Sequence, residues 1–365
     1  MRSRLRFWKY PIFIVLLLSV IAAFTLIYAF NDTAAAPYEQ TAQYDPVVME
    51  TPEPEPPEEP EPLEEPEDIV EDEPEPPDEL EELVDYVPEE IIYFPPPEGG
   101  FITIQMDSSE IHEGFLILVN HSNEFIIPDD LELVNVLDKR TSSLRVQPAS
   151  SQLSPSIIAP LDKMINDFID ETNIRTVAII SAFRTLEAQE RILNNYIARI
   201  GRWAAQRQVS PPGHSEHHTG LAFDFGIISG GVRSTFDGSG RTAWMRRNAH
   251  NYGFILRYPP GKTHITRIMH EPWHFRYVGL PHSIIIFENN WCLEEYIDKI
   301  RGHTMEEPFE VEADGVTYEI YFTPETDVPV PYNSDFTISG NNSDGFIVTL
   351  IRTEIDPDVV TDVST

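Results

Sequence analysis

Cysteine is almost absent from this chain of 365 residues, because Cys292 is the only one. No disulfide can therefore form within the chain, which still does not exclude an exported protein. We expect Cys292 to be a buried structural thiol, because a thiol nucleophile needs an activating base nearby.

Lysine and arginine are missing from the whole stretch between Tyr10 and Asp138. Within it, Glu39–Glu98 holds 24 acidic residues, so only about −12 of the formal net charge of −36 belongs to the rest of the chain. The acidity is thus a property of one segment, and the pI of 4.5 says little about the folded part. Nucleic-acid binding is disfavoured, because phosphate contacts need a basic face that this chain lacks.

Charged residues are also absent from Pro11–Phe30, a run of about twenty apolar or small residues that is long enough to span a bilayer as a helix. Four basic residues precede this run, which places residues 1–10 in the cytoplasm as a short tail by the positive-inside rule. We predict a single-pass anchor at 11–30, with the rest of the chain outside the cell membrane. The alternative is a secreted protein, with a signal peptide cleaved near Ala34–Ala36.

Residues 31–100 hold too few apolar side chains, among many charged ones and prolines, to form a folded core. Pro, Glu and Asp dominate this segment, and Glu-Pro dipeptides recur in it. Such a composition cannot bury enough apolar surface to fold, and its like charges repel one another. We predict a disordered, extended linker that acts as a spacer.

A folded domain is predicted at 101–302. Gly114–Asn120 is expected to be a short buried strand or an extended segment, and helical periodicity predicts an amphipathic helix at Ser156–Glu171. Further helices are expected at Thr185–Ile200, Arg241–Tyr252 and Leu293–Ile300, and strands at Thr176–Ser181, Gly220–Ile228, Phe254–Tyr258 and His274–Val278. Helices and strands mix without regular alternation, which predicts an α+β fold: a mainly antiparallel sheet with helices packed on one face.

Residues 303–365 have a different pattern and are predicted to form a small C-terminal β appendage. Phe309–Tyr321 alternates apolar and polar residues around a turn at Asp314-Gly315, which is typical of a hairpin. Phe336–Ile338 and Phe346–Leu350 supply further strands. Nothing in this part suggests chemistry.

Three polar clusters in the first domain suggest chemistry: Ser181–Arg184 with Gln189, Ser215–Asp224, and Glu271–Tyr277. The second and third can offer two imidazoles and one carboxylate, which is a standard catalytic zinc set with an open position for water. Zinc lowers the pKa of that water to about 7. Glu271 is then a candidate base, and Arg184 a candidate stabiliser of the oxyanion.

Each of these residues also has a structural explanation when taken singly. Arg184 could pair with a surface carboxylate, Ser215 could cap a turn, and Trp273 and Tyr277 could be core or rim aromatics. Within the second cluster, three histidines compete for the role of ligand: His214, His217 and His218. The presence of all three clusters in one domain favours a shared site.

The three clusters resemble the motifs of the VanY-type D-alanyl-D-alanine carboxypeptidases, zinc metallopeptidases of the group that also holds lysostaphin-like enzymes and the hedgehog domain. The motifs occur in order as Ser-x-x-Arg-x-x-x-x-Gln, Ser-x-His-x-x-Gly-x-Ala-x-Asp and Glu-Pro-Trp-His-Phe-Arg-Tyr. The resemblance covers roughly Gly114–Ile300, about half of the chain.

This resemblance implies a role for each motif residue. It implies that His217, Asp224 and His274 bind zinc, that Glu271 is the general base, and that Arg184 polarises the scissile carbonyl. It places Ser215 near the terminal residue of the substrate. The remaining motif side chains are predicted as further substrate contacts: Gln189, Trp273 and Tyr277.

Two features depart from the family pattern or add to it. Phe223 and Phe225 flank Asp224 where smaller aliphatic residues are expected, which puts the shape of the pocket in question. The Gly- and Ser-rich segment Ser229–Gly240 is expected to be a mobile loop near the site.

The sequence therefore predicts a membrane-anchored zinc carboxypeptidase that removes the terminal D-alanine from peptidoglycan stem peptides. One alternative is the same chemistry on tetrapeptide stems, at a bond from an L-centre to D-alanine. Another is a catalytically silent wall-binding module, since the hedgehog domain shows that such a fold can bind without hydrolysing. Competent residues at all five catalytic-type positions disfavour the silent module. The sequence leaves the oligomeric state open.

Overall fold

The computed structural model describes residues 100–313, 315–332 and 334–352. The predicted cytoplasmic tail, membrane anchor and nearly all of the acidic linker lie outside these residues. Within them, no helix combines the length and hydropathy that crossing a membrane requires.

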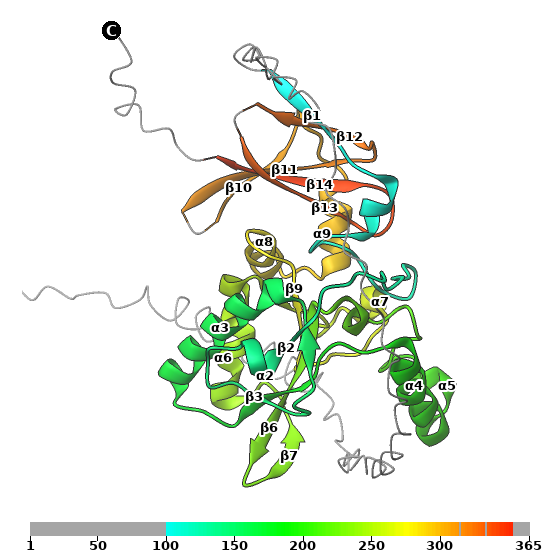
Figure 1. Ribbon diagram of the computed structural model, residues 1–365, viewed down its shortest axis with the longest axis vertical. Helices are drawn as coiled ribbons and strands as arrows, with labels where there is room; N and C mark the ends of the chain where they lie inside the picture. The colour runs from blue at the N-terminus through cyan, green and yellow to red at the C-terminus, as the bar shows by residue number, and fades with distance from the viewer. Residues whose placement is uncertain (1–99, 314, 333, 353–365) are drawn as a thin grey trace, which may run out of the picture. The chain divides into compact units, whose positions relative to one another are not determined.

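A mixed sheet forms the centre of the first domain, in the strand order β3-β5-β6-β9-β8, with β7 paired to β6 (Figure 1). All of these pairs are antiparallel except β3–β5. The strands span Arg145–Val146 (β3), Val177–Ser181 (β5), Ala222–Ser229 (β6), Val232–Thr235 (β7), Phe254–Leu256 (β8) and His274–Tyr277 (β9). The predicted α+β class with a mainly antiparallel sheet is confirmed.

Helices cover one face of this sheet. The apolar side of α3 (Ile158–Thr172) packs with α6 (Ala243–Asn248) against aromatic side chains from β6, β8 and β9, and Figure 1 shows both helices on the same side of the sheet. Phe223 and Phe225 belong to this core and are fully buried. Because side chains alternate along a strand, Asp224 between them points to the opposite face. The two phenylalanines therefore build the core and do not shape a pocket around Asp224.

The remaining helices lie around this framework. Thr185 caps α4 (Leu186–Ile200), since its hydroxyl oxygen accepts a hydrogen bond from the Ala188 amide, and Gly201 ends the helix at a φ of 81°. Shorter elements are α2 (Val136–Lys139), α5 (Arg202–Ala205), α7 (Thr263–Thr266), the strand pair β2 (Val134–Asn135) and β4 (Gln152–Leu153), and 3₁₀ helices at Ser108–His112, Pro155–Ile157, Glu216–Thr219, Gly240–Thr242 and Ala249–Tyr252.

Cys292 precedes α9 (Leu293–Ile300) and is 1% exposed. Burial raises the pKa of its thiol to about 12. A thiol that is buried and protonated at neutral pH cannot serve as a nucleophile. The prediction of a structural thiol is confirmed.

The C-terminal strands form a second sheet in the order β10-β11-β14-β13. These strands span Phe309–Ala313 (β10), Val316–Thr323 (β11), Asp335–Gly340 (β13) and Phe346–Arg352 (β14). Ile320 and Ile347 share a hydrophobic cluster with α8 (His282–Glu288) and α9. The appendage therefore shares a core with the first domain instead of standing apart from it.

Two segments differ from the pattern that their sequences suggest. Phe101–Gln105 (β1), counted with the first domain by its position in the chain, pairs with Asp327–Pro331 (β12) of the C-terminal part. Part of the predicted loop Ser229–Gly240 is strand β7, which forms a hairpin with β6. Gly114–Asn120 belongs to no strand, and Leu116–Val119 within it is buried.

Candidate metal centre and active site

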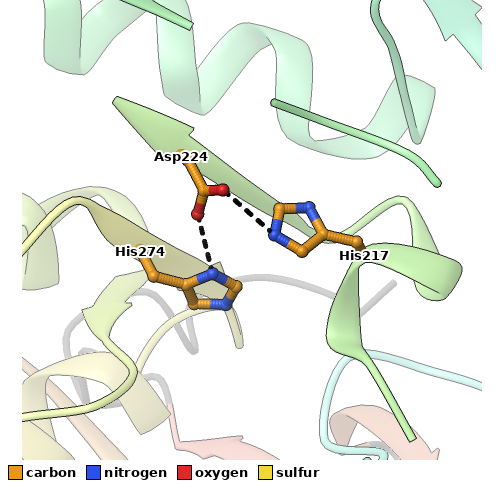
Figure 2. Close-up of side chains that lie close together, drawn as sticks. All are labelled: His217, Asp224 and His274. Carbon is orange, nitrogen blue, oxygen red and sulfur yellow. Dashed lines mark hydrogen bonds and ion pairs between the residues drawn. The ribbon is translucent and has the colours of Figure 1, made fainter. Parts of the chain in front are cut away.

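Three side chains converge on the face of the sheet opposite α3 (Figure 2): His217, Asp224 and His274. One ligand atom from each lies within 4.8 Å of the others. His217 Nε2 is 3.3 Å from Asp224 Oδ2, and His274 Nδ1 is 2.9 Å from Asp224 Oδ1. The structure thus brings together the three residues that the motifs single out as metal ligands.

Strand pairing places two of the three ligands. Asp224 on β6 and His274 at the start of β9 are direct cross-strand partners, so both side chains point to the same face. His217 comes from the 3₁₀ turn Glu216–Thr219 just before β6. Gly220 ends that turn at a φ of +69°, where a Cβ atom would lie 2.7 Å from the Leu133 side chain. Glycine adopts this reversal without strain, and the reversal returns the chain to β6.

Hydrogen bonds orient both imidazoles for metal binding. The Nδ1–H of His217 donates to the Ala182 carbonyl at 2.7 Å, which leaves Nε2 facing the site. His274 Nε2 faces Glu216 Oε2 at 3.4 Å, which leaves Nδ1 facing the site. Such partners of the outer nitrogen are typical of histidines that ligate metals. Two imidazole nitrogens and one carboxylate fit a catalytic zinc ion, whose fourth coordination position these residues leave unfilled.

The pKa values of the triad reflect its burial and its close charges. Burial, with Arg184 nearby, lowers the pKa of His217 to about 4, so its imidazole is neutral at pH 7 and able to ligate. Burial alone would raise the pKa of Asp224, but the two histidines outweigh it and hold that pKa well below its ordinary value. Asp224 is therefore an anion at neutral pH.

Glu271 lies at the edge of the triad. Its Oε2 is 4.0 Å from His274 Nδ1, and its backbone amide donates to the Tyr258 carbonyl at 3.2 Å. Burial raises the pKa of Glu271 to about 8, with a smaller opposing effect of His274. A carboxyl group with its pKa near the working pH is suited to accept a proton and return it.

Arg184 reaches the same site from the loop after β5. Its Nη2 is 3.8 Å from Asp224 Oδ2 and donates to the Ser181 hydroxyl at 2.7 Å, while Nη1 donates to Gln189 Oε1 at 2.7 Å. The guanidinium is mostly buried, with 15% of its side chain exposed. A cation fixed at this position can polarise a carbonyl and stabilise the negative charge that develops on it.

The predicted substrate contacts differ in where the structure places them. Gln189 is 1% exposed, and both ends of its amide are engaged, because Oε1 accepts from Arg184 and Nε2 donates to the Ser210 carbonyl at 2.6 Å. It therefore supports Arg184 from within the fold. Ser215 is buried before the His217 turn and makes no capping hydrogen bond with its side chain.

Trp273 and Tyr277 do not join the triad. Tyr277 makes edge contacts with Phe115 at 5.0 Å and with Phe254 at 5.1 Å, between ring centroids. Along β9 its side chain alternates away from His274, onto the face that packs the hydrophobic core. Trp273 packs against the same core cluster. Both rings therefore pack as the core or rim aromatics that their sequence context also allowed.

Sequence reasoning missed a buried charge cluster behind His274, formed by Glu216, Arg257, Arg276 and Glu294. A signal for part of it was present. Arg276 lies two residues after His274 and therefore on the same strand face, and Glu216 immediately precedes His217. Glu294, on α9, carried no such signal.

Comparisons with known proteins agree with the motifs. The VanY family model, described as D-alanyl-D-alanine carboxypeptidase, matches residues 150–280, which include all three proposed ligands. A D-alanyl-D-alanine carboxypeptidase of Enterococcus faecium is 33% identical over 247 residues, which cover 66% of this chain and 76% of that protein. An enzyme of the same name from Enterococcus faecalis is 32% identical over 213 residues, covering 55% of this chain and 72% of that protein.

A solved structure extends the similarity to the fold. The vancomycin resistance D,D-dipeptidase VanXYg, in complex with a D-Ala-D-Ala phosphinate analogue, superposes with a TM-score of 0.62 at 33% identity. The match covers 70% of this chain and 100% of that one.

Proposed function

Because the chain belongs to the VanY family of D-alanyl-D-alanine carboxypeptidases, we propose that it is a membrane-anchored enzyme that removes the terminal D-alanine from peptidoglycan stem peptides. It is a zinc-dependent metallopeptidase by its family and donor set. The observation that carries the proposal is the placement of a candidate base and a candidate oxyanion stabiliser beside the triad, with Glu271 4.0 Å from His274 and Arg184 3.8 Å from Asp224.

In the proposed mechanism, His217, Asp224 and His274 would hold a zinc ion, which would supply a water of lowered pKa and Lewis acidity toward the scissile carbonyl. Glu271 accepts the proton of the attacking water and then passes it to the amine of the leaving D-alanine. Arg184 stabilises the negative charge on the carbonyl oxygen. Gln189 and Ser181 hold the Arg184 guanidinium in place.

The test is release of D-alanine by the full-length, detergent-solubilised chain from a pentapeptide stem. We expect release to stop when a chelator removes zinc and to return when zinc is added. Tetrapeptide stems and free D-Ala-D-Ala, assayed in parallel, define which peptide is preferred. Bound zinc without release from any of the three peptides would contradict the enzyme proposal and favour a binding module.

We further propose that Pro11–Phe30 remains in the mature protein as its anchor. The support is its length, its lack of charge and the basic residues before it. We expect the protein to fractionate with membranes and its intact mass to include residues 1–36. A soluble protein beginning at or near Pro37 would instead establish signal cleavage and secretion.

A further inference from the structure

A cluster of four buried charges lies next to the proposed metal site. Glu216, Arg257 and Arg276 are no more than 1% exposed, and Glu294 is 8% exposed. Arg257 joins two carboxylates, because its Nε donates to Glu216 Oε1 at 2.7 Å and its Nη1 and Nη2 donate to the two oxygens of Glu294 at 2.8 Å and 2.7 Å. Removing charges from water is costly, and well-packed apolar side chains would often stabilise a fold as well. Stability alone therefore does not explain why these four charges are buried.

Glu216 divides its two oxygens between this cluster and His274. Its Oε1 accepts from Arg257 Nε at 2.7 Å and from Arg276 Nη1 at 2.9 Å, while Oε2 faces His274 Nε2 at 3.4 Å. Two guanidiniums on one oxygen fix the plane of the carboxylate and so hold the other oxygen opposite His274. A proton on Nε2 leaves the Nδ1 lone pair of His274 free for a metal.

One segment of the chain anchors the cluster at both ends, through two backbone carbonyls at Arg276 and a side-chain amide at Glu294. Arg276 Nη2 donates to the Phe115 and Ile117 carbonyls at 3.0 Å and 2.9 Å, and Asn120 Nδ2 donates to Glu294 Oε1 at 3.2 Å. The segment that contains Phe115, Ile117 and Asn120 thus accepts hydrogen bonds from Arg276 and donates one to Glu294. Such a closed network has little freedom to rearrange.

We propose that Glu216 is a positioning residue for zinc binding: held by Arg257 and Arg276, it keeps the His274 ring in the orientation and tautomer that present Nδ1 to the ion. His217 has a backbone carbonyl in the corresponding role, at Ala182. The acceptor behind His274 is instead a carboxylate, which makes that imidazole a more basic ligand. This inference rests on the proposed metal site but not on the substrate.

The test compares two substitutions that each remove one carboxylate from Arg257 in the full-length chain. Glu216→Gln also removes the charged acceptor of His274, whereas Glu294→Gln does not touch His274. Zinc affinity is measured by competition with a chromogenic chelator, and folding by circular dichroism. We expect Glu216→Gln to bind zinc about 10- to 100-fold more weakly, which is typical for loss of such a partner, and Glu294→Gln to bind it as the unchanged chain does.

Equal zinc affinity in all three proteins would overturn the proposal, and so would an equal weakening in both variants, because the network alone would then be responsible. If Glu216→Gln does not fold, Glu216→Asp is measured in its place, since it keeps the charge but shortens the reach to His274; weaker zinc binding is again expected. Failure of both to fold, while Glu294→Gln folds, would make Glu216 a structural residue only. Because zinc affinity needs no substrate, failure of the peptidase proposal would show separately, as tight zinc binding without D-alanine release.

Discussion

Replacing Glu271 by glutamine is expected to lower kcat about 10²- to 10⁴-fold, because the attacking water loses its base and the leaving amine its acid. The amide keeps the size of the side chain and removes only its ability to carry the proton. Zinc content is expected to remain unchanged, since Glu271 is not among the three proposed ligands. Kinetics on a pentapeptide stem, together with elemental analysis, measure both quantities.

The pH dependence of kcat is an independent test of Glu271 as the general base. A general base acts when deprotonated, so activity should rise with pH as Glu271 loses its proton. Its pKa is raised to about 8 by burial in the metal-free site, and the positive charge of zinc lowers it, so the acid limb should lie below pH 8. That limb should disappear in Glu271→Gln.

The matched control is Glu288→Gln, the same chemical change at an exposed residue at the end of α8. It should leave kcat and the pH profile as they are. If Glu271→Gln kept most of its activity, as Glu288→Gln is expected to do, another group would have to be the base.

Replacing Arg184 by lysine is expected to lower kcat about 10²- to 10³-fold, the usual effect of losing one preorganised oxyanion donor. Lysine keeps the positive charge, but its single nitrogen on a flexible chain replaces the two fixed guanidinium nitrogens that donate separately to Gln189 and Ser181. The charge is therefore no longer held at a fixed point beside Asp224. Steady-state kinetics measure the loss, and zinc affinity should change little.

Arg191→Lys on the exposed side of α4 makes the same exchange away from the site and serves as the control. A raised KM with an unchanged kcat in Arg184→Lys would contradict a role in stabilising the transition state. It would assign Arg184 to substrate binding instead.

Local sequence patterns predicted much of the first domain. The apolar spacing of Ser156–Glu171 predicted α3, and the apolar run Thr176–Ser181 predicted β5, because both patterns reflect the burial of a single element. Leu293–Ile300 was predicted with the bounds that α9 has. The predicted hairpin also agrees with the antiparallel pair β10–β11, in which Ala313 faces Val316, since adjacent residues encode a hairpin.

Pairings between distant residues could not be predicted in this way. Strand β1 lies beside β12, with Phe101 opposite Pro331, and no local pattern encodes a partner so far along the chain. The face of the sheet onto which a side chain points also decides whether a motif residue belongs to the core or to the site. Tyr277 and His274 belong to one motif, yet strand alternation sends Tyr277 to the core and His274 to the site.

The sequence by itself determined the residue types of the site and their order along the chain, because zinc chemistry restricts which side chains can serve at a spacing that local turns and strands can realise. Only the tertiary structure decided which atoms face one another. The carboxylate of Glu216 meets Arg276 across 60 residues, and Gln189 turns inward to hold Arg184. Such partners are selected by three-dimensional packing and by the need to satisfy every buried charge, and neither leaves a periodic trace in the sequence.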